Sequence, residues 1–170
     1  MAYPDRANGK LSHGGHGMRF MHKDALDAIV DILDDNFNTM IATIRTERSD
    51  ATIPDCNLFT SGLLQGNIAF PQCKVSFLKE EIIEDETLSD LIDEMGTRYY
   101  FNVMFALMDN TANLEDHCCY YIEACQRVLQ GYYDNDITWI RCKGSEIGQI
   151  TDSEQNETYK GLSIQFEVRI

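Results

Sequence analysis

The sequence lacks the long apolar segments of membrane and secreted proteins. No stretch of the 170 residues approaches the ~18 to 20 consecutive apolar residues that a membrane-spanning helix needs. The first twenty residues, MAYPDRANGKLSHGGHGMRF, lack the apolar core of a signal peptide. We therefore expect a protein of a soluble, reducing compartment with no membrane partner.

Motifs of the common enzyme classes are also lacking. The chain has no Gly-rich phosphate loop, no GxSxG elbow, no HExxH helix and no CxxC pair. Three of its four histidines, His13, His16 and His22, fall near the N-terminus, and His117 is alone on a predicted helix. These absences predict a protein that is not an enzyme, with no catalytic residues, no cofactor and no metal site.

Positive charge is scarce and unevenly placed. Lys and Arg number 14 against 28 Asp and Glu, a net charge of −14. Residues 1–23 are nevertheless basic, with Arg6, Lys10, Arg19 and Lys23 against Asp5. An acidic body repels nucleic-acid phosphates, which disfavours direct DNA binding by the folded domain but suits a surface that DNA slides past.

The six cysteines fit neither a zinc site nor a disulfide framework. Without a secretory signal we expect free thiols that pack as small apolar side chains. Neighbouring helical residues point about 100° apart, so the run His117-Cys118-Cys119 is a poor metal site. The cysteines are Cys56, Cys73, Cys118, Cys119, Cys125 and Cys142.

The N-terminal half predicts an arm, a helix and a long connection. Residues 1–22 have no apolar period and predict a flexible basic arm. Residues 23–48 show an apolar i, i+3, i+4, i+7 stripe with aspartates off it, which predicts an amphipathic helix with a solvated acidic face. The connection 49–71 is too long for a simple turn. Its apolar residues need a partner or fold back onto the core: Leu58, Phe59, Leu63 and Leu64.

The C-terminal part alternates between strand and helix patterns. Period-two apolar patterns predict strands over 73–78, 98–108, 137–142, 146–150 and 162–170, and a hydrophilic loop over 151–161. An acidic tract follows the first strand and contains a short helical stripe over 88–96, and a longer helix is predicted over 114–129. The fold expected for residues 23–170 is a single α+β domain. Its sheet is mixed or mostly antiparallel, with about four to five strands and helices on one face.

The order of these elements resembles the tail terminator (tail completion) proteins of long-tailed bacteriophages, lambda type. In both, an N-terminal amphipathic helix and a loop with a proline precede the first strand, here Phe70-Pro71-Gln-Cys-Lys-Val-Ser-Phe-Leu. That strand runs into an acidic tract, here Lys79-Glu-Glu-Ile-Ile-Glu-Asp-Glu-Thr-Leu. A long strand, a helix and an alternating C-terminal strand follow. The resemblance spans about residues 23–170, while the stretch 88–96 is longer than the family pattern.

The resemblance implies a structural virion protein assembled in the host cytoplasm. Such proteins form a ring, here expected to be a hexamer, on the head-proximal end of the tail tube. The ring ends tube polymerisation and joins a head-side connector, and DNA passes through its lumen. The loops 50–70 and 143–160 and the tract 80–94 are the expected contact regions. The expected assembly-interface residues are Leu58, Phe59, Leu63, Leu64, Ile82, Ile83, Glu84 and Asp85, and the expected lumen-lining residues are Asp31, Asp34, Asp35, Glu80 and Glu81.

Three other functions remain open on the sequence. Another connector of the head–tail neck, a stopper or adaptor, shares the small size and ring assembly. A small metal-dependent hydrolase would use carboxylates of the acidic tract, Glu80, Glu84, Asp85 and Asp90. A monomeric partner-binding module is the third alternative.

Overall fold

The computed structural model describes residues 22–83, 96–108, 113–133, 137, 139–152 and 157–169. These residues form five strands and two helices, which confirms the α+β fold expected from the sequence. The predicted arm, apart from His22, and the predicted helix 88–96, apart from Gly96, lie outside the described residues. No helix in the described part is long and apolar enough to cross a membrane.

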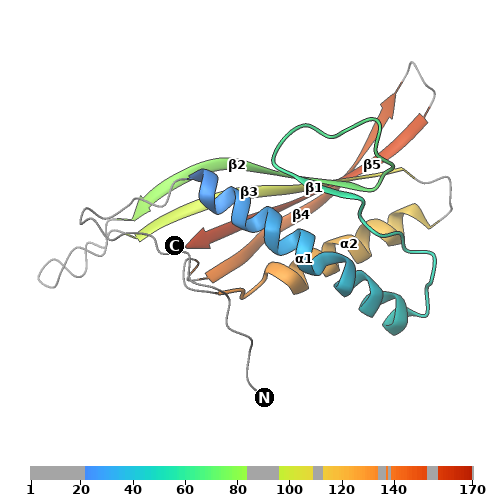
Figure 1. Cartoon of the computed structure of the whole chain (residues 1–170), viewed down its shortest axis with the longest axis horizontal. Coiled ribbons are helices and arrows are strands. Elements are labelled where there is room, and N and C mark those ends of the chain that lie inside the picture. The colour runs from blue at the N-terminus through green and yellow to red at the C-terminus, as the bar shows by residue number, and fades with distance from the viewer. Residues whose placement is uncertain are drawn as a thin grey trace, which may run out of the picture.

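The sheet is mixed, with the strand order β1-β2-β3-β5-β4. Only β1 pairs in parallel with its neighbour; the other three pairings are antiparallel. Both helices, α1 (His22–Arg48) and α2 (Leu114–Leu129), lie on one face of the sheet (Figure 1). The strands are β1 (Leu58–Thr60), β2 (Gln72–Ile83), β3 (Gly96–Leu107), β4 (Trp139–Asp152) and β5 (Glu157–Arg169).

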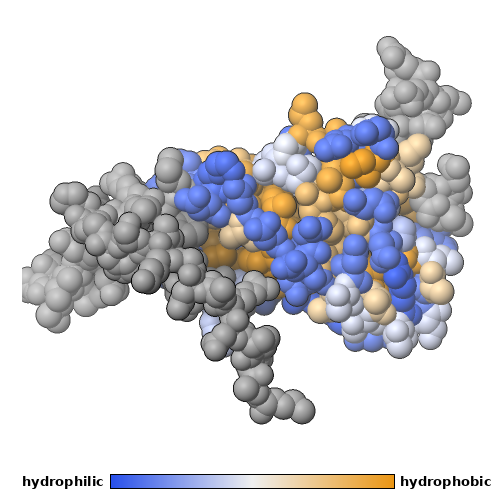
Figure 2. Space-filling view, viewed as in Figure 1, coloured by the Kyte–Doolittle hydropathy of each residue, from blue (hydrophilic) through white to orange (hydrophobic). Residues whose placement is uncertain are grey.

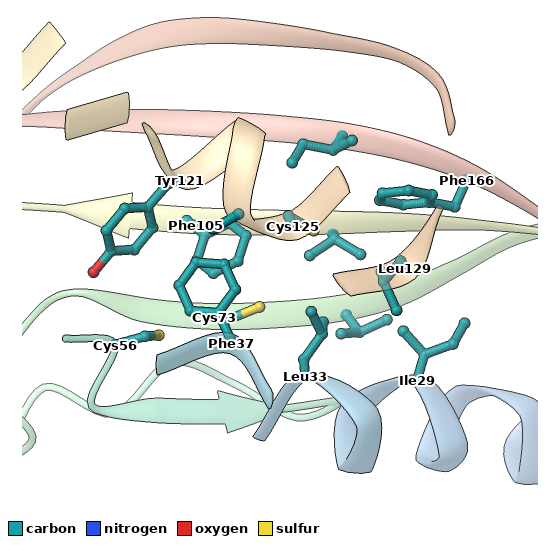
Figure 3. Packing of buried hydrophobic residues seen from close by; sticks show 14 of the residues in the cluster. Ile29, Leu33, Phe37, Cys56, Cys73, Phe105, Tyr121, Cys125, Leu129 and Phe166 are labelled. Atoms are coloured by element: carbon teal, nitrogen blue, oxygen red, sulfur yellow. The ribbon is translucent and has the colours of Figure 1, made fainter. Parts of the chain in front are cut away.

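The core lies between the helices and the sheet. Phe37 of α1 stacks on Phe105 of β3, with ring centroids 4.9 Å apart, and meets Tyr121 of α2 edge-on at 5.1 Å (Figure 3). The Tyr121 hydroxyl donates a hydrogen bond to the Pro54 carbonyl, which satisfies its polar atom inside the core. Burial of so many aromatic rings fixes both helices against this one face of the sheet.

Charged pairs join the two helices at their surface. Arg48 of α1 lies 3.0 Å from Glu123 of α2, and Arg127 of α2 lies 2.9 Å from Glu47 of α1. Arg127 also pairs with Glu123 one helical turn away, at 2.6 Å. Exposed pairs of this kind contribute little stability each, but they neutralise the charge where the helices meet.

The strands are longer than the sequence predicts. The first strand was expected to end at residue 78, yet β2 continues to Ile83, through the start of the acidic tract. Residues 137–142 and 146–150 were expected to form two strands, but β4 runs unbroken over Trp139–Asp152. Most of the predicted contact loop 143–160 is therefore a β-hairpin with a register shift between Cys142 and Gly144. Within the predicted connection 49–71 the structure adds β1.

Candidate assembly surface

The sheet face opposite the helices is not covered by any described element (Figure 1). Because side chains alternate along a strand, the residues that alternate with the buried ones face this side. Among the side chains that the structure describes, this open face has six cations and three carboxylates. The cations are Lys74, Lys79, Arg98, Arg141, Lys143 and Arg169, and the carboxylates are Glu81, Glu146 and Glu167.

Glu167 of β5 is the centre of an ion-pair network on the open face. Its side chain is only 4% exposed, and its two carboxylate oxygens lie 3.3 Å from Arg98 Nε and 3.2 Å from Lys143 Nζ. The three residues come from β3, β4 and β5, so the network spans three adjacent strands. A buried carboxylate is costly unless it is paired, and these two cations provide the pairing.

Aromatic rings fill the spaces between these charges. Lys79 Nζ lies 4.5 Å from the centroid of the Tyr100 ring, and the Tyr100 hydroxyl donates a 2.8 Å hydrogen bond to Glu81. The hydrogen bond from Lys79, followed by that from Tyr100, lowers the pKa of the Glu81 carboxyl. The Arg169 guanidinium lies 5.0 Å from the centroid of the Trp139 ring. The open face is thus ordered by its own side chains rather than loosely solvated.

A loop that follows β1 borders the open face and is held by Gln72. The Gln72 side chain is buried; its Nε2 donates to the carbonyls of Gln65 and Ile68, and its Oε1 accepts from the Gln65 backbone N–H. Asn57 Nδ2 also donates to the Ala69 carbonyl. These bonds fix the loop while leaving Leu63 82% exposed.

An apolar groove of about 450 Å³ lies between this loop and the strands. Small residues form its floor because Gly148 of β4 faces Gly161 of β5 across the ladder. Leu64 lines one side of the groove, and Ile147 and Glu146 line another. Figure 2 shows apolar side chains gathered over the region of this loop and the neighbouring strands.

The opposite side of the molecule is acidic. Five aspartates occupy the half of α1 nearest its N-terminus, and only Lys23 offers a cation in that half. Hydrophilic side chains follow the line of α1 in Figure 2. We call these five residues the α1 ridge: Asp24, Asp27, Asp31, Asp34 and Asp35.

The predicted interface residues are divided between the core and the surface. Phe59 folds back onto the core, 5.5 Å from Phe37 between ring centroids. Leu58 is half-buried at the sheet edge, whereas Leu63 and Leu64 are exposed in the loop. Ile82 and Ile83 lie at the end of β2, paired with Thr97 and Gly96. Glu84 and Asp85 lie outside the described residues.

The predicted lumen residues do not share one surface. Asp31, Asp34 and Asp35 are exposed on α1, as the solvated-face interpretation expects. Glu81 faces the open side of the sheet, but Glu80 faces the helix side, where its carboxylate lies 3.4 Å from His22 Nδ1. The structure therefore separates Glu80 and Glu81, which adjoin in the sequence, onto opposite faces of β2.

The structure describes only part of the set of residues considered for metal chemistry. Within the described residues, no group of three His, Cys, Asp or Glu side chains is placed to hold a metal ion. Of the hydrolase set, Glu80 is described, and Glu84, Asp85 and Asp90 are not. His117 is buried, with Nε2 3.2 Å from the Thr52 hydroxyl, and so packs within the fold.

The cysteines are free, as expected from the sequence, and four of them are buried: Cys56, Cys73, Cys118 and Cys125. Burial raises the pKa of the Cys56 thiol to about 12 and that of Cys118 to about 11. Burial also raises the pKa of Cys73 and Cys125. These thiols serve packing, whereas Cys119 is exposed on α2.

Sequence reasoning missed the two residues that organise this surface. Gln72 directly precedes the predicted strand 73–78, and its burial and its hydrogen bonds to the loop become visible only in the structure. The alternating pattern over 162–170 places Glu167 opposite the apolar residues of its strand and gives no sign that it is buried. Its burial depends on Arg98 and Lys143, which lie far away in the sequence and become neighbours only through the strand register.

The fold defines the class: an α+β protein with two helices on one side of a mixed sheet and an ordered, charged open face on the other. No protein-family model matches the chain, and no curated protein matches it. Among solved structures, one chain of unstated function is 11% identical, with a TM-score of 0.43, over 82% of this chain and 95% of its own. A chain from the "Virion of native gene transfer agent (GTA) particle" is 13% identical, with a TM-score of 0.39, over 84% of this chain and 98% of its own.

Proposed function

We propose that this chain is a structural subunit of a phage-like virion, and specifically a tail terminator. It assembles as a ring, expected to be a hexamer, on the head-proximal end of the tail tube. There it ends tube polymerisation and offers the surface that joins the head-side connector. It catalyses no reaction in this role.

The observation that carries the proposal is the two-sided surface of the domain. One side presents an ordered, half-exposed sheet face with an apolar groove, and the other presents an acidic helix. A subunit of a closed ring needs two different contact surfaces, one for each neighbour. The order of helix, loop, strand and acidic tract that resembles tail terminators supports the finer assignment.

The acidic charge supports passage of DNA through such a ring. A net charge of −14 repels phosphates, so DNA moves through the lumen without adhering. The exposed carboxylates of Asp31, Asp34 and Asp35 are available for such a surface or for a neighbouring subunit.

Electron microscopy of particles assembled without this chain tests the proposal. A tail terminator predicts overlong tubes of variable length beside tailless heads. Tails of normal length beside unjoined or leaking heads would instead indicate a stopper or adaptor. Intact, normal virions would contradict a structural role, and a melting temperature that rises with a divalent metal would then favour the hydrolase alternative.

A further inference from the structure

Charge is separated between the two sides of this molecule. The open sheet face has six cations against three carboxylates among its described side chains, although the whole chain has twice as many acids as bases. The two helices together have nine carboxylates against four Lys and Arg. The helices cover only one side of the sheet, so the two charged surfaces point in opposite directions (Figure 1).

Three of the five α1 ridge carboxylates have no cation partner among the residues that the structure describes. Lys23 pairs with Asp27, but Asp31, Asp34 and Asp35 make no ion pair with the residues that the structure describes. At 100° per residue the five ridge aspartates fall within one narrow arc, opposite the buried Ile29 and Leu33. By contrast, Glu47 of α1 and Glu123 of α2 each pair with an arginine of the other helix.

We infer that the open sheet face of one copy binds the α1 ridge of the next copy. This rests on the proposed ring and names its subunit contact. Because the contact joins two different surfaces of the same chain, it is heterologous, and repetition of such a contact closes into a ring when the rotation allows. Complementary charges set the partner and the register of the contact, and the groove beside Leu64 receives apolar surface next to it.

A nucleic acid is the other partner that a basic face with aromatic residues suggests, but the details disfavour it. Glu167 already pairs with Arg98 and Lys143, and Arg169 stacks on Trp139, which removes that ring as a platform for a base. The chain as a whole is strongly negative and repels phosphates. A carboxylate helix of a second copy needs no ring platform, and Lys74 and Arg141, which make no ion pair with the described residues, remain available to it.

Reciprocal charge reversal tests the contact in the purified full-length chain. The face variant is Lys74→Glu with Arg141→Glu, and the ridge variant is Asp31→Lys with Asp34→Lys; all four side chains are at least partly exposed. Asp116→Lys is the control, since it reverses an exposed charge on α2 away from both surfaces. Sedimentation velocity over a concentration series, at low and high salt, measures self-association.

The wild type and the control are expected to associate, and high salt to weaken both. Each double variant is expected to associate about tenfold or more weakly, since like charges then face each other. An equimolar mixture of the two variants restores association, because each reversed face meets a reversed ridge. The chain that combines all four substitutions is also expected to associate, because the reversed face of one copy meets the reversed ridge of the next.

Three results would overturn the docking assignment. One is a wild type that stays monomeric, and another is a pair of variants that associate like the wild type. The third is a labelled single-stranded oligonucleotide that binds the wild type and not the face variant. Overlong tubes in particles lacking the chain would still support the proposed function in these cases. Normal virions would contradict the function whatever the sedimentation result.

Discussion

Glu167 shows how one buried carboxylate organises an uncovered sheet face. We predict that Glu167→Gln lowers the free energy of unfolding by about 1–2 kcal/mol, because it leaves Arg98 and Lys143 without their shared partner. This loss of stability is smaller than that expected on breaking a fully buried ion pair, because the side chains of Arg98 and Lys143 both reach solvent. Denaturant titration measures it. Glu146→Gln, an exposed change on the same face, is the control and is expected to stay within about 0.5 kcal/mol of the wild type.

Thiol exposure gives a second prediction at the residue scale. The thiolate is the reacting form, and burial both shields Cys56 and Cys118 and raises the pKa of their thiols. We expect a thiol reagent to modify Cys119 first in the folded chain, half-buried Cys142 more slowly, and the four buried cysteines only on unfolding. Mass spectrometry after timed labelling identifies the sites. Loss of the fast phase in Cys119→Ser confirms the order; fast labelling of Cys73 or Cys125 would contradict the core packing.

At the scale of elements, the turn that follows α2 contains a glycine in the left-handed backbone region. Gly131 has φ of +75° and follows the C-cap residue Gln130. A side chain there is strained in the left-handed region, so Gly131→Ala is expected to cost about 1 kcal/mol of stability. Gly66→Ala, in a position without positive φ or close neighbours, is the matched control. Equal melting temperatures of the two variants would refute the argument.

The loop anchored by Gln72 gives another prediction for an element. Gln72→Ala removes three hydrogen bonds to the loop backbone and leaves buried polar groups unpaired. We expect a stability loss of about 1–3 kcal/mol and faster proteolytic cleavage within residues 61–69. Gln165→Ala, an exposed change on β5, is the control and is expected to alter neither the stability nor the rate of cleavage. Unchanged cleavage in Gln72→Ala would show that the loop is held by other contacts.

The sequence predicts helices better than strand lengths, for a local reason. The stripes of α1 and α2 repeat every 3.6 residues over several turns, so their limits agree with the structure within a residue or so. In β2 the charged run Lys79–Glu81 predicts the end of the strand and the start of an acidic tract. The structure continues the strand through this run, because the exposed end of a strand accommodates charged side chains. In β4 the sequence predicts two strands, over 137–142 and 146–150, whereas the structure continues the strand through a register shift between Cys142 and Gly144.

At the scale of the whole molecule, the candidate surface could not be predicted from sequence. Its members come from β2, β3, β4 and β5, and their proximity depends on the pairing register between strands. Net charge indicates an acidic protein, but not that most of the described open-face charges are positive. The acidic face of α1 was predictable, because a single helix determines it.

The edges of the sheet are the remaining exposed feature. Within the described residues, β1 covers β2 only from Gln72 to Lys74, and β4 has a strand on one side only. Unpaired strand edges offer backbone hydrogen bonds to any other chain, and charged residues along them are the usual protection. Near the isoelectric point of about 4.5 that protection is weakest, so turbidity measured against pH should peak there. Handling this protein above pH 7 keeps those edges soluble, and mild acid favours edge-to-edge aggregation over ordered assembly.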